Sequence, residues 1–216
     1  MSLGLDFSIV VIIALNVLIS FKGFNDFSFF EKYKFNVGAV KAGQQYRNIT
    51  SGFLHADMPH LLFNMVTLYF FAPFLVQQLD SYKFILVYVV SLLMGSLLSF
   101  GIHKENNYYS AIGASGAVTG VIYAAVTMFP EMKLYMFFAI PIKGWIFGIL
   151  YLAYSIYGMK KSVGNIGHAA HFGGAMGGYA LALILKPEIL SQNLFYTILI
   201  GLPILALFIL MKLKKI

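Results

Sequence analysis

The chain has 216 residues, of which 60% are hydrophobic and 11% charged, and its mean hydropathy is +0.81. Soluble domains are roughly half apolar and about a quarter charged, so this composition excludes an ordinary soluble domain and makes lipid the expected solvent. The absence of cysteine excludes disulfides and thiolate metal sites. The net charge is +7, but the basic residues lie between apolar runs, which fits anionic lipid headgroups better than nucleic acid.

Seven apolar runs predict an all-α, polytopic membrane helical bundle. They cover residues 5–21, 58–79, 84–102, 114–130, 134–157, 168–185 and 194–211. The first run lacks a basic flank and a small-residue cleavage site, so we expect a retained helix and not a signal peptide. Pro141 and Lys143 interrupt the fifth run. The alternative there is a membrane helix that begins only near Gly144, with 134–142 as a short connection.

One long polar connection, Lys22 to Arg47, contains seven charged residues and several aromatic ones. Its Phe and Tyr content predicts that it packs at the membrane interface. The distribution of Lys and Arg residues along the chain bears on its orientation in the membrane. With Met1 in the cytoplasm, eleven of the fifteen Lys and Arg residues would lie outside, so the positive-inside rule favours Met1 outside.

Polar side chains at the starts of three apolar runs are candidate functional residues, because ionisable groups inside a membrane are costly. His60 and Asn64 are four apart at the start of the second run, and His168 and His171 are three apart at the start of the sixth. Ser115 opens the fourth run. One helix intervenes between each pair of these runs, so all three helices run in the same direction and begin at the same membrane face. Ser115, His60 and His171 are therefore expected to lie at a similar depth.

Glycine spacing predicts how closely these helices approach. Gly116 and Gly120 form a small-xxx-small pair on the fourth run, and Gly174 and Gly178 form another on the sixth. Such pairs allow two helix backbones to come into contact. A close crossing would bring Ser115 against a histidine of the sixth run, which is a nucleophile next to a base.

The eight acidic residues lie nearly all in loops or at helix ends. The inventory therefore favours a Ser115–His171 dyad over a triad with a carboxylate. The Ser115 N–H at a helix start, with His60 and Asn64, could supply an oxyanion hole.

Each of these features also has a purely structural interpretation. A GxSG motif in a glycine-rich membrane helix can reflect packing alone, and His60 with Asn64 can be an interhelical hydrogen-bond pair. His168 with His171 could instead ligate heme or copper. We expect His55 to lie at the membrane interface and His103 to be solvated. The coincidence of three polar groups on three parallel helices favours the catalytic interpretation, which needs no metal or cofactor.

The motifs "GASG", "HLLFN", "AHFGGAMGG" and "QYRNITSGFLH" resemble those of the rhomboid family of intramembrane serine proteases, over the chain up to about residue 186. The resemblance implies that Ser115 is the nucleophile and His171 the general base. It implies that His60 and Asn64 complete the oxyanion hole with the Ser115 N–H, and that Gly113 shapes the turn before the serine. We take Gly116 and His168 as supporting residues.

The resemblance also implies an architecture and a substrate. Residues 1–186 would form a six-helix catalytic core in which the fourth helix is short, so that Ser115 lies below the membrane surface. Residues 187–216 would add a seventh helix and a basic tail. The substrates would be single-span membrane proteins cut within or near their span, and we expect the bacterial inner membrane. Family precedent places the N-terminus in the cytoplasm, against the Lys/Arg count.

Some positions depart from the family pattern. Thr119 stands where the family often has an aromatic residue that packs on the base, so the positioning of His171 must come from elsewhere. Tyr46-Arg47 replaces the usual Trp-Arg, and Gln77 and Gln78 occupy the region of a family acidic residue. The alternative function is a non-catalytic relative that binds transmembrane helices for trafficking or degradation.

Overall fold

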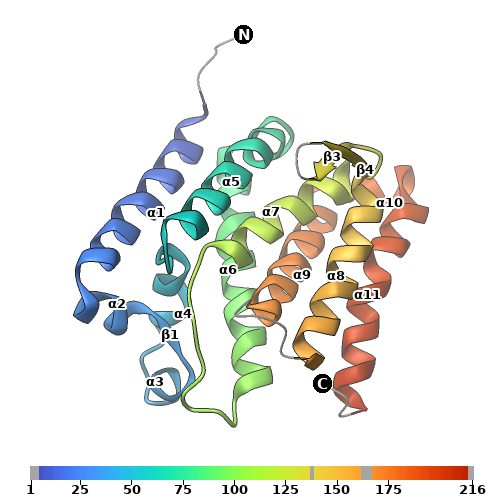
Figure 1. Ribbon diagram of the computed structural model, residues 1–216. Coiled ribbons are helices and arrows are strands. Elements are labelled where there is room, and N and C mark those ends of the chain that lie inside the picture. The colour runs from blue at the N-terminus through green and yellow to red at the C-terminus, as the bar shows by residue number, and fades with distance from the viewer. Residues whose placement is uncertain (1–4, 137–138, 162–166, 214–216) are drawn as a thin grey trace.

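The computed structural model describes residues 5–136, 139–161 and 167–213, and within these ranges it is a bundle of long helices (Figure 1). The seven long helices are α1 (Phe7–Asn25), α5 (Met58–Leu79), α6 (Ser81–His103), α7 (Ser115–Met128), α8 (Gly144–Lys161), α9 (His168–Leu185) and α11 (Leu194–Lys212). Among the described residues, α1, α5, α6 and α11 are each long and apolar enough to cross a membrane. The predicted helical membrane bundle is confirmed.

The fifth predicted span is wrong over residues 134–136 and 140–143, and residues 137 and 138 lie outside the described residues. Strands β3 (Lys133–Met136) and β4 (Ile140–Lys143) form an antiparallel hairpin there, with Leu134 opposite Ile142. Proline has no N–H for a helix, and Pro141 lies within β4. The helix α8 then begins at Gly144, as the alternative prediction had it.

The connection from Lys22 to Arg47 is folded. After α1 it contains α2 (Phe27–Tyr33), β1 (Phe35–Asn36) and α3 (Val37–Lys41), and it leads into α4 (Arg47–Thr50) and the short 3₁₀ helix η1 (Ser51–Phe53). Arg47 is buried, and its guanidinium donates to the carbonyls of Glu31 and Lys34 at 2.8 and 2.7 Å. β1 pairs with β2 (Ser110–Ala111), which places this segment beside the chain that leads into α7.

The helix α9 lies between α6 and α7, with glycine on both contact faces. A Cβ on Gly174 or Gly178 would overlap a backbone carbonyl oxygen of α7, and a Cβ on Gly173 would overlap the carbonyl oxygen of Met94 in α6. The backbones are therefore in direct contact. Small residues permit this approach where lipid supplies no hydrophobic driving force between helices. The predicted close crossing of the fourth and sixth runs is confirmed.

The helix α7 is the shortest of the seven. Its 14 residues correspond to about 21 Å at 1.5 Å per residue, whereas the hydrocarbon core of a bilayer is about 30 Å thick. If its C-terminal end reaches one face, its first residue lies well below the other. This length fits the expected position of Ser115 beneath the membrane surface.

The last helices lie at the edge of the bundle. After α10 (Ile189–Gln192), α11 packs mainly against α8. It is also joined to α9, because the Tyr179 hydroxyl donates to the carbonyl of Thr197 at 3.0 Å.

Gly178→Ala should destabilise the bundle. Its new methyl group would meet the carbonyl oxygen of Gly120, a backbone atom that cannot rotate away. We expect the free energy of unfolding to fall by about 1–3 kcal/mol, the usual cost of overpacking. Thermal unfolding in detergent measures it. Gly101→Ala in α6 is the matched control, since nothing lies within 4 Å of its Cβ position. Equal melting temperatures for the two variants would contradict the assigned contact.

Candidate active site

The turn before α7 is held in an unusual backbone conformation. Gly113 has φ +116°, which disfavours any side chain, and its N–H donates to the carbonyl of Ser51 at 3.0 Å. A Cβ on Gly113 would also lie 2.8 Å from the imidazole of His60. Glycine is therefore required here by both conformation and space. The turn ends at Ser115, the first residue of α7.

Ser115 and His171 are in direct contact. The Ser115 Oγ lies 2.6 Å from the His171 Nε2, within hydrogen-bond distance. Ser115 begins α7, and His171 lies in the first turn of α9, where its N–H donates to the carbonyl of Gly167. Both side chains are half-buried. The glycine-lined crossing of α7 and α9 brings them together, and the pair has the geometry of a hydroxyl nucleophile beside a base.

His60 lies against the turn that precedes Ser115. Its Nε2 is within 3 Å of the Cβ position of Gly113, and the Ser115 Oγ is 3.7 Å from the same point. Its Nδ1 accepts a hydrogen bond from the N–H of Ala56 at 3.4 Å. A neutral imidazole that accepts at Nδ1 carries its proton on Nε2. His60 therefore presents an N–H donor toward the Ser115 turn.

Asn64 lies one helical turn beyond His60 on the same face of α5. It is 3% exposed, and its Nδ2 donates to the carbonyl of His60 at 3.0 Å. One of its two amide hydrogens is thus used within α5. The second remains as a donor for another acceptor.

His55 is buried among protein side chains, which does not test its expected depth at the membrane interface. It is 1% exposed, and its Nδ1 is 2.8 Å from the hydroxyl of Ser20 in α1. That hydroxyl donates its single hydrogen to the carbonyl of Phe53, so it accepts from the His55 Nδ1–H. The His55 Nε2 then accepts from the N–H of Ala114 at 3.4 Å. His55 thus ties the Ser115 turn to α1.

The pKa of His55 is lowered to about 3. Burial is the largest cause, and electrostatic repulsion from the nearby His60 is the next largest. The ring is therefore neutral near pH 7, with one donor and one acceptor nitrogen, as the contacts with Ser20 and Ala114 require. The sequence offered one signal for His55, since it lies five residues before His60.

Tyr151 of α8 also belongs to the site, although sequence analysis did not single it out. Its hydroxyl lies 3.0 Å from the His171 Nδ1, and the two ring planes differ by 25° with centroids 6.2 Å apart. Thr119 does not contact the base directly but lies 3.3 Å from the same hydroxyl. The only sequence signal for Tyr151 was indirect. The threonine at position 119 indicated that another residue must position His171.

The two supporting residues lie around this centre. A Cβ on Gly116 would be 3.2 Å from the carbonyl oxygen of Ala170, so Gly116 allows α7 to approach α9. His168 is buried against α8, where it fits over Gly158 and meets the ring of Tyr154 edge-on. We place His168 in the packing of α9 on α8, beside the centre that Ser115 and His171 form.

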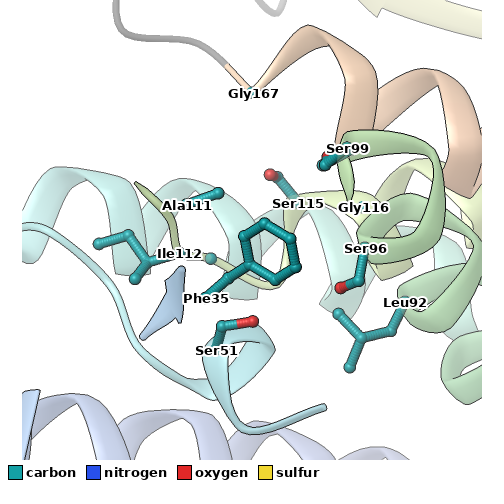
Figure 2. Close-up of a pocket in the computed structure, with 12 residues that line it drawn as sticks. Phe35, Ser51, Leu92, Ser96, Ser99, Ala111, Ile112, Ser115, Gly116 and Gly167 are labelled. Atoms are coloured by element: carbon teal, nitrogen blue, oxygen red, sulfur yellow. The ribbon is translucent and has the colours of Figure 1, made fainter. Parts of the chain in front are cut away.

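A small pocket opens beside Ser115 (Figure 2), and its volume is about 30 Å³. That is room for a water molecule. The hydroxyl-bearing residues of its lining are Ser51, Ser96, Ser99 and Ser115. The rest of the lining is apolar side chains and glycine, so Ser115 borders a small, mainly apolar pocket with a few hydroxyl groups. Among residues 5–136, 139–161 and 167–213, no group of three or more His, Cys, Asp or Glu side chains is placed to hold a metal ion.

Comparison with known proteins adds independent information. The family model described as the Rhomboid domain matches residues 42–188. RHOMBOID-like protein 12, mitochondrial, of Arabidopsis thaliana is 26% identical over 77% of this chain and 54% of its own length. Rhomboid protein 1, mitochondrial, of Saccharomyces cerevisiae is 33% identical over 67% of this chain and 43% of its own. The putative rhomboid protease YdcA of Bacillus subtilis is 32% identical over 69% of this chain and 71% of its own length.

The chain thus spans about half the length of the first two of these relatives. Two of the three relatives are named as mitochondrial and one is bacterial. The expected bacterial inner membrane therefore gains no support from them. What stands is a multi-pass membrane protein.

Ser20→Ala should loosen the turn before Ser115. It leaves the buried His55 Nδ1–H without its acceptor, which costs about 1–3 kcal/mol. We expect the free energy of unfolding in detergent to fall by that amount, and the melting temperature to fall with it. Thr67→Val is the control, because the Thr67 hydroxyl bonds only within its own helix, to the carbonyl of Phe63. If Ser20→Ala and Thr67→Val have the same melting temperature, the connection through His55 does not stabilise the protein.

Proposed function

The chain belongs to the rhomboid family, and we propose that it is an intramembrane serine endopeptidase that works through a Ser115–His171 dyad. The observation that carries this proposal is the 2.6 Å contact between the Ser115 Oγ and the His171 Nε2 at the start of a short, buried helix. We further propose residues 1–186 as the catalytic core, with 187–216 as an added helix and tail. The substrates would be single-span membrane proteins.

The two side chains account for a complete acyl transfer. The Ser115 Oγ attacks the carbonyl carbon of the scissile bond while its proton passes to the His171 Nε2. The imidazolium then returns this proton to the leaving amine as the C–N bond breaks, which leaves an acyl ester on Ser115. Water attacks the ester, its proton passes to the same nitrogen, and the Ser115 hydroxyl is regenerated. No step requires a metal or a cofactor.

We propose that three donors serve the oxyanion. The Ser115 N–H is among the first four of α7, which have no partner within the helix. The His60 Nε2–H faces the same turn, and Asn64 retains one amide hydrogen. Each well-placed donor contributes roughly 3 kcal/mol to stabilisation of the transition state. This arrangement supports acyl transfer over helix binding alone.

Ser115→Ala and His171→Ala should each abolish cleavage. Purified wild type and variants would be incubated in liposomes with a tagged single-span substrate of low helix stability. Wild type should cut it, and a fluorophosphonate should label Ser115. The rate should fall at least about 10³-fold in either variant, as in other serine proteases that lose a catalytic group.

The other outcomes have distinct meanings. Cleavage that persists in Ser115→Ala comes from a contaminant. Wild type that neither cuts several substrates nor reacts with the fluorophosphonate, although it is folded, contradicts the protease. Retention of the substrate by that folded protein would instead support the helix-binding alternative.

Substrate choice should follow helix stability. A helical span hides its scissile amide in hydrogen bonds, and in lipid no water compensates for opening them. We expect spans with Gly or Pro in the half nearest Ser115, and a small residue before the cut, to be cut faster than a leucine-rich span. The measurement is kcat/KM for a matched pair of substrates that differ only in those positions. Equal values for the pair would contradict an unwinding step.

A further inference from the structure

The base of the proposed dyad needs a partner on its second nitrogen. To accept the Ser115 proton at Nε2, a neutral His171 must carry its own proton on Nδ1. In a triad a carboxylate holds that proton in place. Here the group at the His171 Nδ1 is the hydroxyl of Tyr151, at 3.0 Å. This oxygen comes from α8, a helix that contributes neither Ser115 nor His171.

We propose that Tyr151 is the positioning residue for His171, an inference that rests on the proposed function. Its hydroxyl accepts the Nδ1–H and so fixes the tautomer. Its ring meets the imidazole end-on through this hydroxyl, with centroids 6.2 Å apart and ring planes that differ by 25°. The hydroxyl performs the orienting function of a triad carboxylate without placing a charge inside the membrane.

Thr119 completes the direction of the hydrogen bonds. Because the Tyr151 oxygen accepts from His171, its own proton points elsewhere, and the Thr119 Oγ1 lies 3.3 Å away. Thr119 is four residues after Ser115, on the same face of α7. The hydrogen bonds then run from His171 to Tyr151 to Thr119. This gives a physical reason for a threonine at the position that departs from the family pattern.

The arrangement does not change when the proton moves. After the Ser115 proton reaches Nε2, the imidazolium still donates its Nδ1–H to the Tyr151 oxygen, and that bond becomes charge-assisted. No proton leaves Nδ1, and Tyr151 stays neutral. The Tyr151 ring is itself held, because it stacks on Phe147 with centroids 5.5 Å apart and meets Tyr123 at 6.3 Å.

Tyr151→Phe separates positioning from packing, since it keeps the ring and removes the hydroxyl. Tyr179→Phe is the matched control. It removes a tyrosine hydroxyl that also bridges two helices, α9 and α11, through the carbonyl of Thr197. We expect Tyr151→Phe to lower kcat and the rate of fluorophosphonate labelling about 10–100-fold, by analogy with the loss of the hydrogen-bond partner that orients a metal-binding histidine. KM should be unchanged, and the melting temperature should match that of Tyr179→Phe.

Two further variants grade the effect. Thr119→Val should lower kcat less than Tyr151→Phe, because Thr119 acts only through the tyrosine. Thr119→Ser keeps the hydroxyl and should have the kcat of wild type. Normal kcat in Tyr151→Phe would overturn the proposal. So would a fall in kcat that Tyr179→Phe shares in equal measure.

A readout independent of catalysis separates this inference from the proposed function. Nitrogen-15 NMR of histidine-labelled protein reports which ring nitrogen carries the proton, and His171→Ala assigns the signal. We expect the Nδ1–H form in wild type and a mixture of tautomers in Tyr151→Phe. An unchanged tautomer overturns the role of Tyr151 even if the protein cleaves substrates. The expected change upholds it even if no substrate is cut.

Discussion

Backbone contact between α7 and α9 is the constraint on which the site depends. Gly174 and Gly178 leave no room for a methyl group against the carbonyls of α7. Because the two helices touch along their length, the first residue of one and the first turn of the other are fixed relative to each other. The 2.6 Å contact between Ser115 and His171 follows from that register. A larger residue at either glycine would separate the catalytic atoms as well as weaken the fold.

The turn before Ser115 is secured from the opposite direction. Ser51 holds the N–H of Gly113, and His55 holds the N–H of Ala114 and is itself bonded to α1. The strand pair of β1 and β2 joins the folded segment after α1 to the same turn. The nucleophile therefore lies between two anchored regions. This matters because the short α7 cannot by itself fix how deep Ser115 lies in the membrane.

Chain direction and glycine spacing were sufficient to predict which polar residues would meet. The order of the apolar runs placed the starts of three helices at one face, and the glycine pairs predicted their close crossing. His55 was missed because its burial depends on Ser20, 35 residues earlier in the chain. Tyr151 was missed because an aromatic residue in a membrane helix is unremarkable until the facing helix is known. The β3–β4 hairpin was obscured by its apolar sequence, which resembles the start of a span.

The tyrosine partner follows from the cost of charge in lipid. A buried carboxylate would orient His171 and stabilise the imidazolium more strongly, but an unpaired charge at that depth costs several kcal/mol. A tyrosine hydroxyl accepts the same hydrogen bond and remains neutral. In the proposed protease it would stabilise the imidazolium less, so the donors around the oxyanion would have to contribute more. The proposed donors are the Ser115 N–H, His60 and Asn64, and of these His60 lies against Gly113 in the turn before Ser115.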